Sequence, residues 1–152
     1  MTEVDRVWRV NKLSQLSQLS QLQSTFLDRM KFAKYVFYIA GIYGLIATLP
    51  QYFMEAKTSA DYPPAITHPE YYYGFFGVTM AFQVVFLLIG SNPVRFRPLM
   101  PVSALLEKFP FVIAMYALYA AGRVYPIMVG LATIDLILGI LFLIAYLKTP
   151  KE

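Results

Sequence analysis

The sequence predicts an all-α integral membrane protein, in which four transmembrane helices form an antiparallel bundle and an amphipathic helix precedes them at the membrane interface. Composition is the first observation behind this prediction: the 152 residues are 58% hydrophobic and 14% charged, whereas soluble domains carry about 25% charged residues. The second is the length of the apolar runs. Residues 35–54 and 71–94 carry no charge, and residues 124–147 carry only Asp135, so each run reaches the roughly 20 residues that cross a membrane.

Four spans are expected, at about residues 33–54, 71–92, 102–122 and 124–147. The third is the least apolar, because its uncharged run covers only residues 109–122, and a full span must include Glu107 and Lys108 in its first turns. The connection "GRVYP" between the third and fourth spans is very short, which makes these two spans antiparallel neighbours. The chain is thus divided into a four-span domain over residues 31–152 and a preceding segment over residues 1–30.

The first thirty residues are expected to be a cytoplasmic helical segment outside the spans. Apolar residues at helical spacing, Val4, Val7 and Trp8, lie there among basic ones, which is typical of an amphipathic helix on a membrane surface. The repeat "LSQLSQLSQL" follows, and leucines that recur every third residue drift around the surface of an α-helix. Two interpretations of the repeat stay open: a low-complexity segment without a specific role, or a helix that lies on lipid or on a partner subunit.

The distribution of Lys and Arg predicts the orientation. Basic residues gather before the first span, between the second and third spans, and in the C-terminal tail, whereas the other two connections carry only Lys57 and Arg123. By the positive-inside rule, both termini face the cytoplasm, and the chain is a multi-pass protein of the inner or plasma membrane. The net charge of +4 is therefore attributed to topology and to contact with anionic lipid, with no nucleic acid as a partner. The residues expected at the lipid surface are Trp8, Arg6, Arg9, Lys12, Arg95 and Arg97.

A carboxylate in the middle of a span is a candidate functional group. Asp135 and Gln83 both fall near the middle of their runs, so they are predicted to meet at the same depth as a polar pair. Arg123 is about 18 Å from Asp135 along the helix, at 1.5 Å per residue, and no other cation is expected within reach. Asp135 is therefore predicted to be a protonated acid that donates a hydrogen bond to Gln83.

Small residues predict which helix faces pack, because close approach holds helices together in lipid. Ala132 and Gly139 bracket Asp135 in the fourth span, and Lys108 is expected to extend toward the cytoplasmic surface. In the first and third spans the predicted packing faces are Ala40, Gly44, Ala47 and Gln51, and Glu107, Pro110, Ala114, Ala117 and Ala121. The candidate polar core or ligand-binding set is Asp135, Gln83, Thr79, Glu107 and Tyr116.

The sequence lacks the residues that several kinds of catalytic and cofactor site require. There is no cysteine and only one histidine, His68, so disulfides, thiolate catalysis, iron–sulfur clusters and bis-histidine haem ligation within one chain are excluded. The sequence also has no HExxH or GxSxG motif and no Walker or Rossmann glycine pattern. We therefore expect no metal site and no cofactor, and we assign no catalytic residue.

The first functional expectation is a non-enzymatic membrane protein, either an accessory subunit or a bundle that binds an apolar ligand. Membrane lipid, another membrane subunit and a second copy of the chain are the expected partners. One alternative is a proton-coupled transporter of small solutes that acts as an oligomer, with Asp135, Gln83 and Glu107 along its path. The other is an isomerase for lipid or sterol substrates with intramembrane carboxylates as acid and base, although Asp135 and Glu107 are expected at depths about 9 Å apart.

Three strings, "HPEYYYGF", "RPLMPVSALLEKF" and "LYAAGR", lie within residues 34–150. In this region the chain resembles small bacterial four-span integral membrane proteins without an assigned activity, and the resemblance implies the architecture alone. Through its span order and "AFQVVFLL" in the second span, it is more faintly similar to the four-span sterol-isomerase and sigma-2-receptor group. That group places an acidic residue shortly before the corresponding Gln, where this chain has Gly77, Val78 and Thr79.

Overall fold

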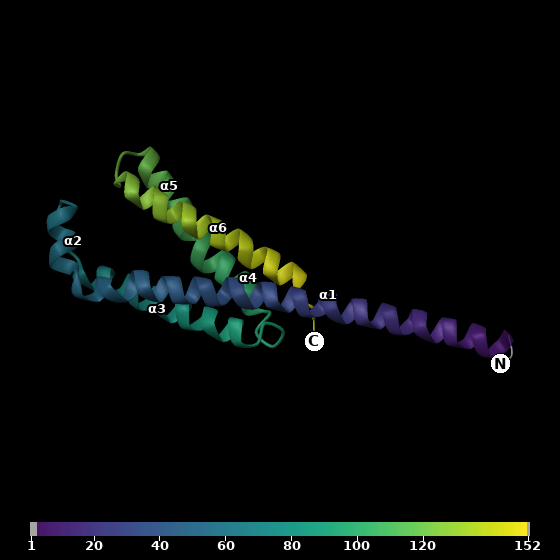
Figure 1. The fold of residues 1–152 in the computed structure, drawn as a ribbon. Coiled ribbons are helices and arrows are strands. Elements are labelled where there is room, and N and C mark those ends of the chain that lie inside the picture. Colours follow the sequence, from purple (N-terminus) through teal and green to yellow (C-terminus); the bar gives the residue numbers. More distant parts are fainter. Residues whose placement is uncertain (1–2, 152) are drawn as a thin grey trace.

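The computed structural model of this chain describes residues 3–151, with side chains at residue 8 and from residue 11 onward, and these residues form an all-helical fold (Figure 1). The predicted fold class is confirmed to that extent. The third long helix is composite, because a π-helical segment, η2, joins α4 to α5. In chain order the elements are α1 (Glu3–Thr48), the 3-10 segment η1 (Leu49–Phe53), α2 (Glu55–Asp61), α3 (Pro69–Ser91), α4 (Leu99–Val102), η2 (Ser103–Lys108), α5 (Phe109–Ala120) and α6 (Pro126–Lys148).

Four helical stretches are long and apolar enough to cross a membrane, as predicted. They are Asn11–Phe53, Pro69–Ser91, Leu99–Ala120 and Pro126–Lys148. The last three begin and end within three residues of the predicted spans, because prolines stand at the starts of α3 and α6 and fix the backbone for a first helical turn. The first stretch is much longer than predicted.

Helix α1 has no break between the segment over residues 1–30 and the first span. Its 46 residues extend about 69 Å at 1.5 Å per residue, and the N-terminal part projects away from the other helices (Figure 1). No Gly or Pro interrupts the leucine–serine–glutamine repeat, and serine hydroxyls such as that of Ser17, which donates to the carbonyl of Ser14, bond back onto the helix. A helix lying along the membrane surface would need a bend near residue 31 that α1 does not have.

The helices pack as two pairs, and the two pairs meet where α1 contacts α6. Helix α1 packs along α3, α5 packs along α6, and α6 also contacts α1, α4 and η2. The antiparallel neighbours predicted from the short connection, α5 and α6, are confirmed. Within the described residues α5 makes no extensive contact with α1 or α3, and in Figure 1 the α5–α6 pair diverges from the α1–α3 pair. A bundle closed on all four sides therefore stays a prediction.

The core lies at one end of the four helices. Phe37, Phe86 and Phe142 are fully buried; the Phe37 and Phe142 rings stack at 4.2 Å between centroids, and Phe86 contacts Phe142 edge-on at 4.8 Å. Small residues let the backbones approach around these rings. The remaining buried members of the cluster are Ala33, Ala40, Ile89, Met100, Ala104 and Ala145.

The two ends of the four-helix region differ in chemistry. We call the end formed by residues 28–34, the 91–99 connection and the end of α6 the basic end. We call the opposite end, with Tyr52, Tyr62, Tyr73 and Tyr125, the tyrosine end. There the α2–α3 connection reaches the α5–α6 connection, since the Tyr125 hydroxyl donates to the carbonyl of Pro63 at 3.0 Å. The two helix pairs are thus joined at the tyrosine end through their connections.

Candidate functional site

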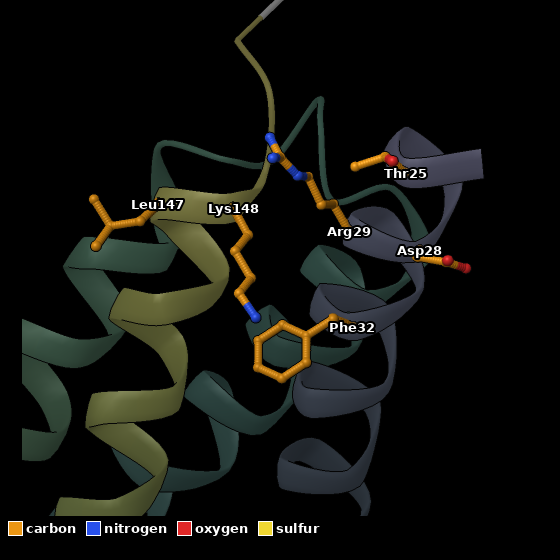
Figure 2. Close-up of a pocket in the computed structure, with 6 residues that line it drawn as sticks. All are labelled: Thr25, Asp28, Arg29, Phe32, Leu147 and Lys148. Carbon is orange, nitrogen blue, oxygen red and sulfur yellow. The ribbon is translucent and has the colours of Figure 1, made fainter. Parts of the chain in front are cut away.

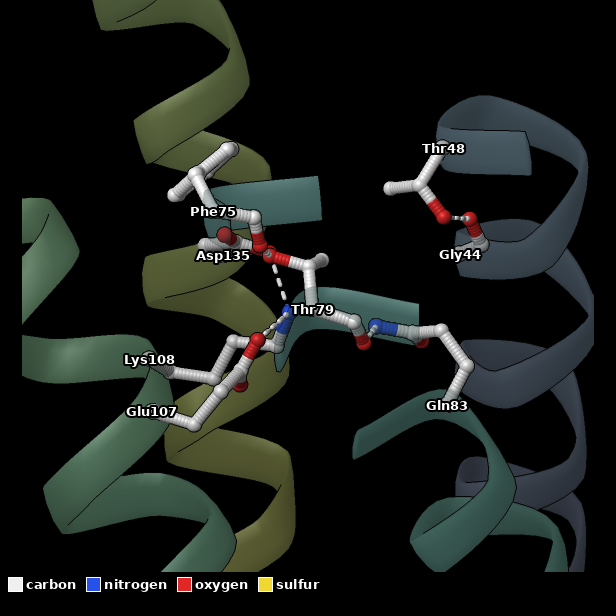
Figure 3. Close-up of polar contacts among 8 residues, drawn as sticks. All are labelled: Gly44, Thr48, Phe75, Thr79, Gln83, Glu107, Lys108 and Asp135. Carbon is white, nitrogen blue, oxygen red and sulfur yellow. Dashed lines mark hydrogen bonds and ion pairs between the residues drawn. The ribbon is translucent and has the colours of Figure 1, made fainter. Parts of the chain in front are cut away.

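The main group of buried charged side chains in the helical region is an ionic cluster of Glu107, Lys108 and Asp135 (Figure 3). The ammonium of Lys108, at the end of η2, lies 2.7 Å from Asp135 Oδ1 on α6 and 3.1 Å from Glu107 Oε1. Lys108 is 4% exposed, and the side chains of Glu107 and Asp135 are 11% and 21% exposed. Two carboxylates therefore share one cation in the interior of the candidate spans, and Asp135 is the member that is most open to its surroundings.

The π-helical segment η2 places Lys108 and Glu107 in this cluster. Pro110 has no N–H to bond the carbonyl of Leu106, and in a regular α-helix its ring would meet that carbonyl. The π turns of Ser103–Lys108 directly before it widen the helix at this point. A π turn holds about one residue more than an α turn. Residues before and after η2 that a uniform α-helical period would place on one face of the third span therefore lie on different faces.

Close approach of η2 to α6 depends on a glycine. A Cβ atom at Gly139 would lie 2.5 Å from Cε1 of Phe109 and 3.3 Å from Cβ of Lys108. Gly139 is four residues after Asp135, so the two share one face of α6. The missing side chain at Gly139 lets Lys108 come near enough for its ammonium to reach the Asp135 carboxylate.

The cluster rests on the aromatic core. The Lys108 ammonium lies 5.4 Å from the ring centroid of Phe86 on α3, and Phe86 is part of the phenylalanine stack. A cation over an aromatic ring is stabilised by about 2 kcal/mol when it is desolvated. The position of Lys108 is consequently fixed on one side by two carboxylates and on another by a rigid ring.

The charges of the cluster do not balance. Glu107 and Asp135 are both acidic and Lys108 is the one cation in contact with them among the described residues, so the fully ionised set has an excess negative charge. The second oxygen of Glu107, Oε2, is buried and has no hydrogen-bond partner within the described part of the chain. Burial of an uncompensated charge or acceptor costs free energy. The arrangement is therefore suited to take up a proton, a cation or a hydrogen-bond donor.

Gln83 lies elsewhere, against α1 (Figure 3). Its Nε2 donates to the carbonyl of Thr79 at 3.0 Å, and its Oε1 is buried without a partner among the described residues. The side chain occupies the space left by Gly44 on α1, where a Cβ atom would collide with Gln83 Oε1. The predicted pair between Asp135 and Gln83 is wrong, because each side chain has its own contacts on a different helix pair.

Two further predictions about the cluster are corrected. Asp135 was expected to have no cationic partner, and the structure gives it Lys108, so a protonated Asp135 no longer follows. Lys108 was expected to extend to the cytoplasmic surface, and its side chain turns inward instead. Both errors have one cause, since η2 changes the direction in which the residues before Pro110 point.

Thr79 and Tyr116, the other two members of the predicted polar set, do not enter the cluster through their hydroxyls. The Thr79 hydroxyl donates to the carbonyl of Phe75 at 2.9 Å. The Tyr116 hydroxyl lies 2.8 Å from Oγ1 of Thr133, which links α5 to α6. Of the five predicted residues, the structure brings Asp135 and Glu107 together and places the other three outside their ion-pair network.

The small-residue faces are only partly where the pattern predicts them. Ala40 and Gly44 on α1 and Ala132 and Gly139 on α6 are buried, as expected. Ala47 is exposed, and so is the whole predicted face of the third span beyond Glu107. The displacement at η2 explains the latter, because it separates the face of Glu107 from that of the following residues. The exposed members are Pro110, Ala114, Ala117 and Ala121.

The residues predicted at the lipid surface differ in their contacts. Trp8 is 61% exposed, with the Lys12 ammonium 4.8 Å from its ring, and Arg95 is exposed. Arg97 holds the end of α6 instead: its Nε donates to the Thr149 carbonyl at 2.8 Å, and its guanidinium lies 3.9 Å from the Tyr146 ring. The side chains of Arg6 and Arg9 lie outside the described residues.

Lys108 is the member of the site that sequence reasoning missed. Two signals pointed to it: Pro110 inside a span indicates a local departure from the α-helix, and Gly139 one turn after Asp135 indicates close approach of another element. Among the described side chains there is no group of three or more His, Cys, Asp or Glu that could hold a metal ion. The contacts within the cluster are ion pairs and hydrogen bonds.

No protein-family model, curated protein or solved structure matches this chain. The resemblances drawn from its sequence strings accordingly stay predictions, and the residues of the site carry the functional argument.

Proposed function

We propose that this chain is a non-enzymatic membrane protein that binds a small, mainly apolar ligand through a cationic or hydrogen-bond-donating head group. The observation that carries the proposal is the ionic cluster, in which Glu107 and Asp135 share Lys108 and Glu107 Oε2 is buried without a partner among the described residues. An unsatisfied buried acceptor costs about 1–3 kcal/mol. A ligand that donates to this oxygen recovers that free energy and offsets the excess negative charge.

The apolar part of the ligand would lie on the tyrosine-end side of the cluster. Two aromatic side chains there are partly exposed: Phe75 on α3 is 49% exposed and Tyr116 on α5 is 41% exposed. Phe75 meets Phe111 on α5 at 5.9 Å between ring centroids, and the Tyr116 hydroxyl bonds to Thr133, two residues before Asp135 on α6. These aromatic side chains would offer the apolar surface.

Membrane placement is part of the same proposal. Four helices with the length and hydropathy of spans would cross the inner or plasma membrane, with the basic end and both termini in the cytoplasm by the positive-inside rule. The cluster would then lie inside the membrane, where a charged group is costly and is commonly functional.

Binding of a set of matched amphiphiles tests the proposal. The full chain in detergent is mixed with dodecylamine, dodecanol or dodecanoate, and retained ligand is counted by native mass spectrometry. We expect dodecylamine to be retained most and dodecanoate least, because the excess charge of the cluster is negative. Glu107→Gln should reduce dodecylamine retention by about tenfold or more, which corresponds to the loss of one charge-assisted hydrogen bond.

Glu70→Gln is the matched control, because it removes the same charge from an exposed position at the start of α3. It should leave retention unchanged. Equal retention of the amine and the carboxylate, or equal effects of the two variants, would contradict the proposal.

An accessory-subunit role is the other form of this proposed function, and the exposed small residues of α5 support it. Ala114 and Ala117 on α5 and Ala121, which directly follows it, lie at helical spacing and are exposed, and small residues allow close helix contact in membranes. The partner would be another membrane subunit or a second copy. Because the chain has no cysteine, Ala117→Cys provides a single cross-linking position: a disulfide dimer in native membranes identifies a second copy, and a mixed cross-link identifies a different subunit.

A proton-coupled transporter is a second candidate function, and the charge count of the cluster favours it. Two carboxylates on one ammonium can hold one exchangeable proton without leaving a net charge. Proteoliposomes with an internal pH dye test this: a proton flux that Glu107→Gln abolishes and Glu70→Gln preserves would favour transport over ligand binding alone. The lipid or sterol isomerase stays a prediction, now with both carboxylates within hydrogen-bonding distance of the same ammonium.

A further inference from the structure

A recess lies between α1 and the end of α6 at the basic end, away from the ionic cluster (Figure 2). Its volume is about 430 Å³. It combines two cations with an aromatic ring and a few polar groups, and nothing in the proposed function uses it. The lining residues are Thr25, Asp28, Arg29, Phe32, Leu147 and Lys148.

The charge of the recess is positive on the side that faces α6. In Figure 2 the Arg29 guanidinium extends from α1 toward the segment that follows α6, and the Lys148 side chain runs between the two helices toward Phe32. The Asp28 carboxylate points away from them and pairs with Lys31 at 3.5 Å. Within the described residues neither Arg29 nor Lys148 forms an ion pair. The recess therefore presents two cations without a counter-charge from residues 3–151.

The depth of the recess fits a lipid head group, given the membrane placement proposed above. Lys148 is the last residue of α6, whose 23 residues extend about 34 Å at 1.5 Å per residue and so match a hydrocarbon core of about 30 Å. Phe32 lies at the same level, since the Lys148 ammonium is 4.5 Å from its ring centroid. The cations thus lie at the boundary between head groups and acyl chains, with an aromatic ring directly on the apolar side.

We propose that this recess binds the phosphate group of an anionic phospholipid, with Arg29 and Lys148 on the phosphate and the Phe32 ring against the upper part of an acyl chain. Guanidinium and ammonium groups are the usual protein partners of phosphate. Basic side chains at the cytoplasmic surface attract anionic lipids by about 1 kcal/mol each. A free phosphate ion shares the head-group chemistry but gains nothing from Phe32, so the lipid is the favoured occupant.

Selectivity between two spin-labelled lipids tests the proposal in nanodiscs that contain the full chain. We compare phosphatidylglycerol with phosphatidylcholine and measure the motionally restricted fraction of each by electron paramagnetic resonance. The wild-type chain should prefer phosphatidylglycerol. The double variant Arg29→Gln/Lys148→Gln should reduce this preference by about 25-fold, since each of the two cations contributes about fivefold.

Lys34→Gln/Arg95→Gln is the matched control, because it removes one Lys and one Arg, and so the same charge, from exposed residues at the basic end. The control should reduce the preference for phosphatidylglycerol by a factor at least about threefold smaller than the double variant does. Equal reductions would overturn the proposal, because they would show only a general attraction between basic residues and anionic lipid. Arg29→Gln alone alters an exposed side chain without hydrogen bonds inside the described chain and keeps the test valid if the double variant unfolds.

Inorganic phosphate distinguishes the lipid from a free ion. Phosphate added to the nanodiscs should leave the restricted fraction of phosphatidylglycerol unchanged at constant ionic strength. Displacement of the lipid by phosphate alone would assign the recess to a soluble ion and overturn the lipid proposal. Failure of the amphiphile experiment at the ionic cluster would not affect this result, because the recess and the cluster share no residue.

Discussion

The basic-end half and the tyrosine-end half of the helical region are packed differently. Toward the basic end, Phe37, Phe86 and Phe142 are fully buried and stacked on one another. Toward the tyrosine end, α5 contacts α6 but no other long helix extensively among the described residues, and Ile113 is 69% exposed. Because lipid tails are as apolar as aliphatic side chains, helices in a membrane are held together by close packing and not by transfer of these side chains out of lipid. The basic-end half therefore supplies the rigidity of the fold.

The ionic cluster lies where these two halves meet. Lys108 rests on Phe86, a member of the packed half, while Asp135 retains partial exposure. A binding site works best when rigid neighbours fix its side chains and one side stays accessible. The contrast between the halves thus explains how a costly set of charges can be held in place while Asp135 stays partly exposed, as the proposed ligand binding requires.

The largest expected effect is loss of the phenylalanine stack. Phe142→Ala removes a fully buried ring that contacts two others, and it should lower the free energy of unfolding by about 3 kcal/mol through the cavity it leaves. The measurement is steric-trapping or denaturant unfolding of the full chain in bicelles. Phe75→Ala truncates a half-exposed ring in the tyrosine-end half and should cost less than about 1 kcal/mol. An equal loss of stability from the two variants would contradict the difference in packing between the halves.

The next effect comes from the cluster itself. Lys108→Met keeps the volume of the side chain but leaves Glu107 and Asp135 without their shared cation. It should lower the free energy of unfolding by about 2 kcal/mol, which is below the roughly 3–5 kcal/mol of a fully buried pair because the Asp135 side chain is 21% exposed. The same unfolding assay measures it. The triple variant Lys108→Met/Glu107→Gln/Asp135→Asn removes the uncompensated charges and should regain at least half of the loss. A triple variant no more stable than the single one would show that Lys108 acts through packing and not through charge.

Infrared spectroscopy provides a direct check of the ion pair, because it separates ionised from protonated carboxyl groups. The band assigned by Asp135→Asn should be that of an ionised carboxylate at neutral pH, because the Lys108 ammonium 2.7 Å away forms an ion pair with it. A protonated acid band would restore the sequence-based expectation for Asp135 and contradict the ion pair.

The sequence predicts the helices far better than the faces they bury. Length, hydropathy and proline position locate three of the four long helices within a few residues, because these properties act locally along the chain. The extent of α1 was missed, since basic residues and a repeat suggested a separate segment. The repeat, however, contains no Gly or Pro to end the helix, and its serine hydroxyls donate back to carbonyls of the same helix.

The candidate site was predicted in part for a different reason. The unusual residues, Asp135 and Glu107, stand out in an apolar run at once, whereas their meeting depends on the π segment and on Gly139. Both are properties of how two elements fit together, so a uniform helical period assigns Lys108 to the wrong side. Depth alone, which suggested the pair of Asp135 and Gln83, does not determine which helices face each other.

A smaller effect sharpens the contrast within the α1–α3 pair. Gly44→Ala places a methyl group where Gln83 lies, and overpacking of this kind should cost about 1–2 kcal/mol. Gly130→Ala on α6 meets no neighbouring atom within 4 Å and should be neutral or slightly stabilising, because alanine favours the helix. Gly44→Ala combined with Gln83→Ala should recover most of the loss in the unfolding assay. If Gly130→Ala destabilised the chain equally, the loss at Gly44 could not be assigned to the collision with Gln83.

The smallest effect is expected at the exposed ion pair of α2, which is the counterpart of the buried cluster at the tyrosine end. Lys57 Nζ lies 2.6 Å from Asp61 Oδ2, and this hydrogen bond, together with the charge of Asp61, raises the pKa of Lys57 above its ordinary value of 10.5. A raised folded-state pKa of a base stabilises the fold below the ordinary pKa, and that contribution disappears as pH rises through the folded-state pKa. Because both side chains are exposed to solvent, Lys57→Ala should leave the unfolding midpoint unchanged within error at neutral pH. A loss comparable to that of Lys108→Met would mean that burial does not separate the two ion pairs, and the contrast between the halves would then need another physical basis.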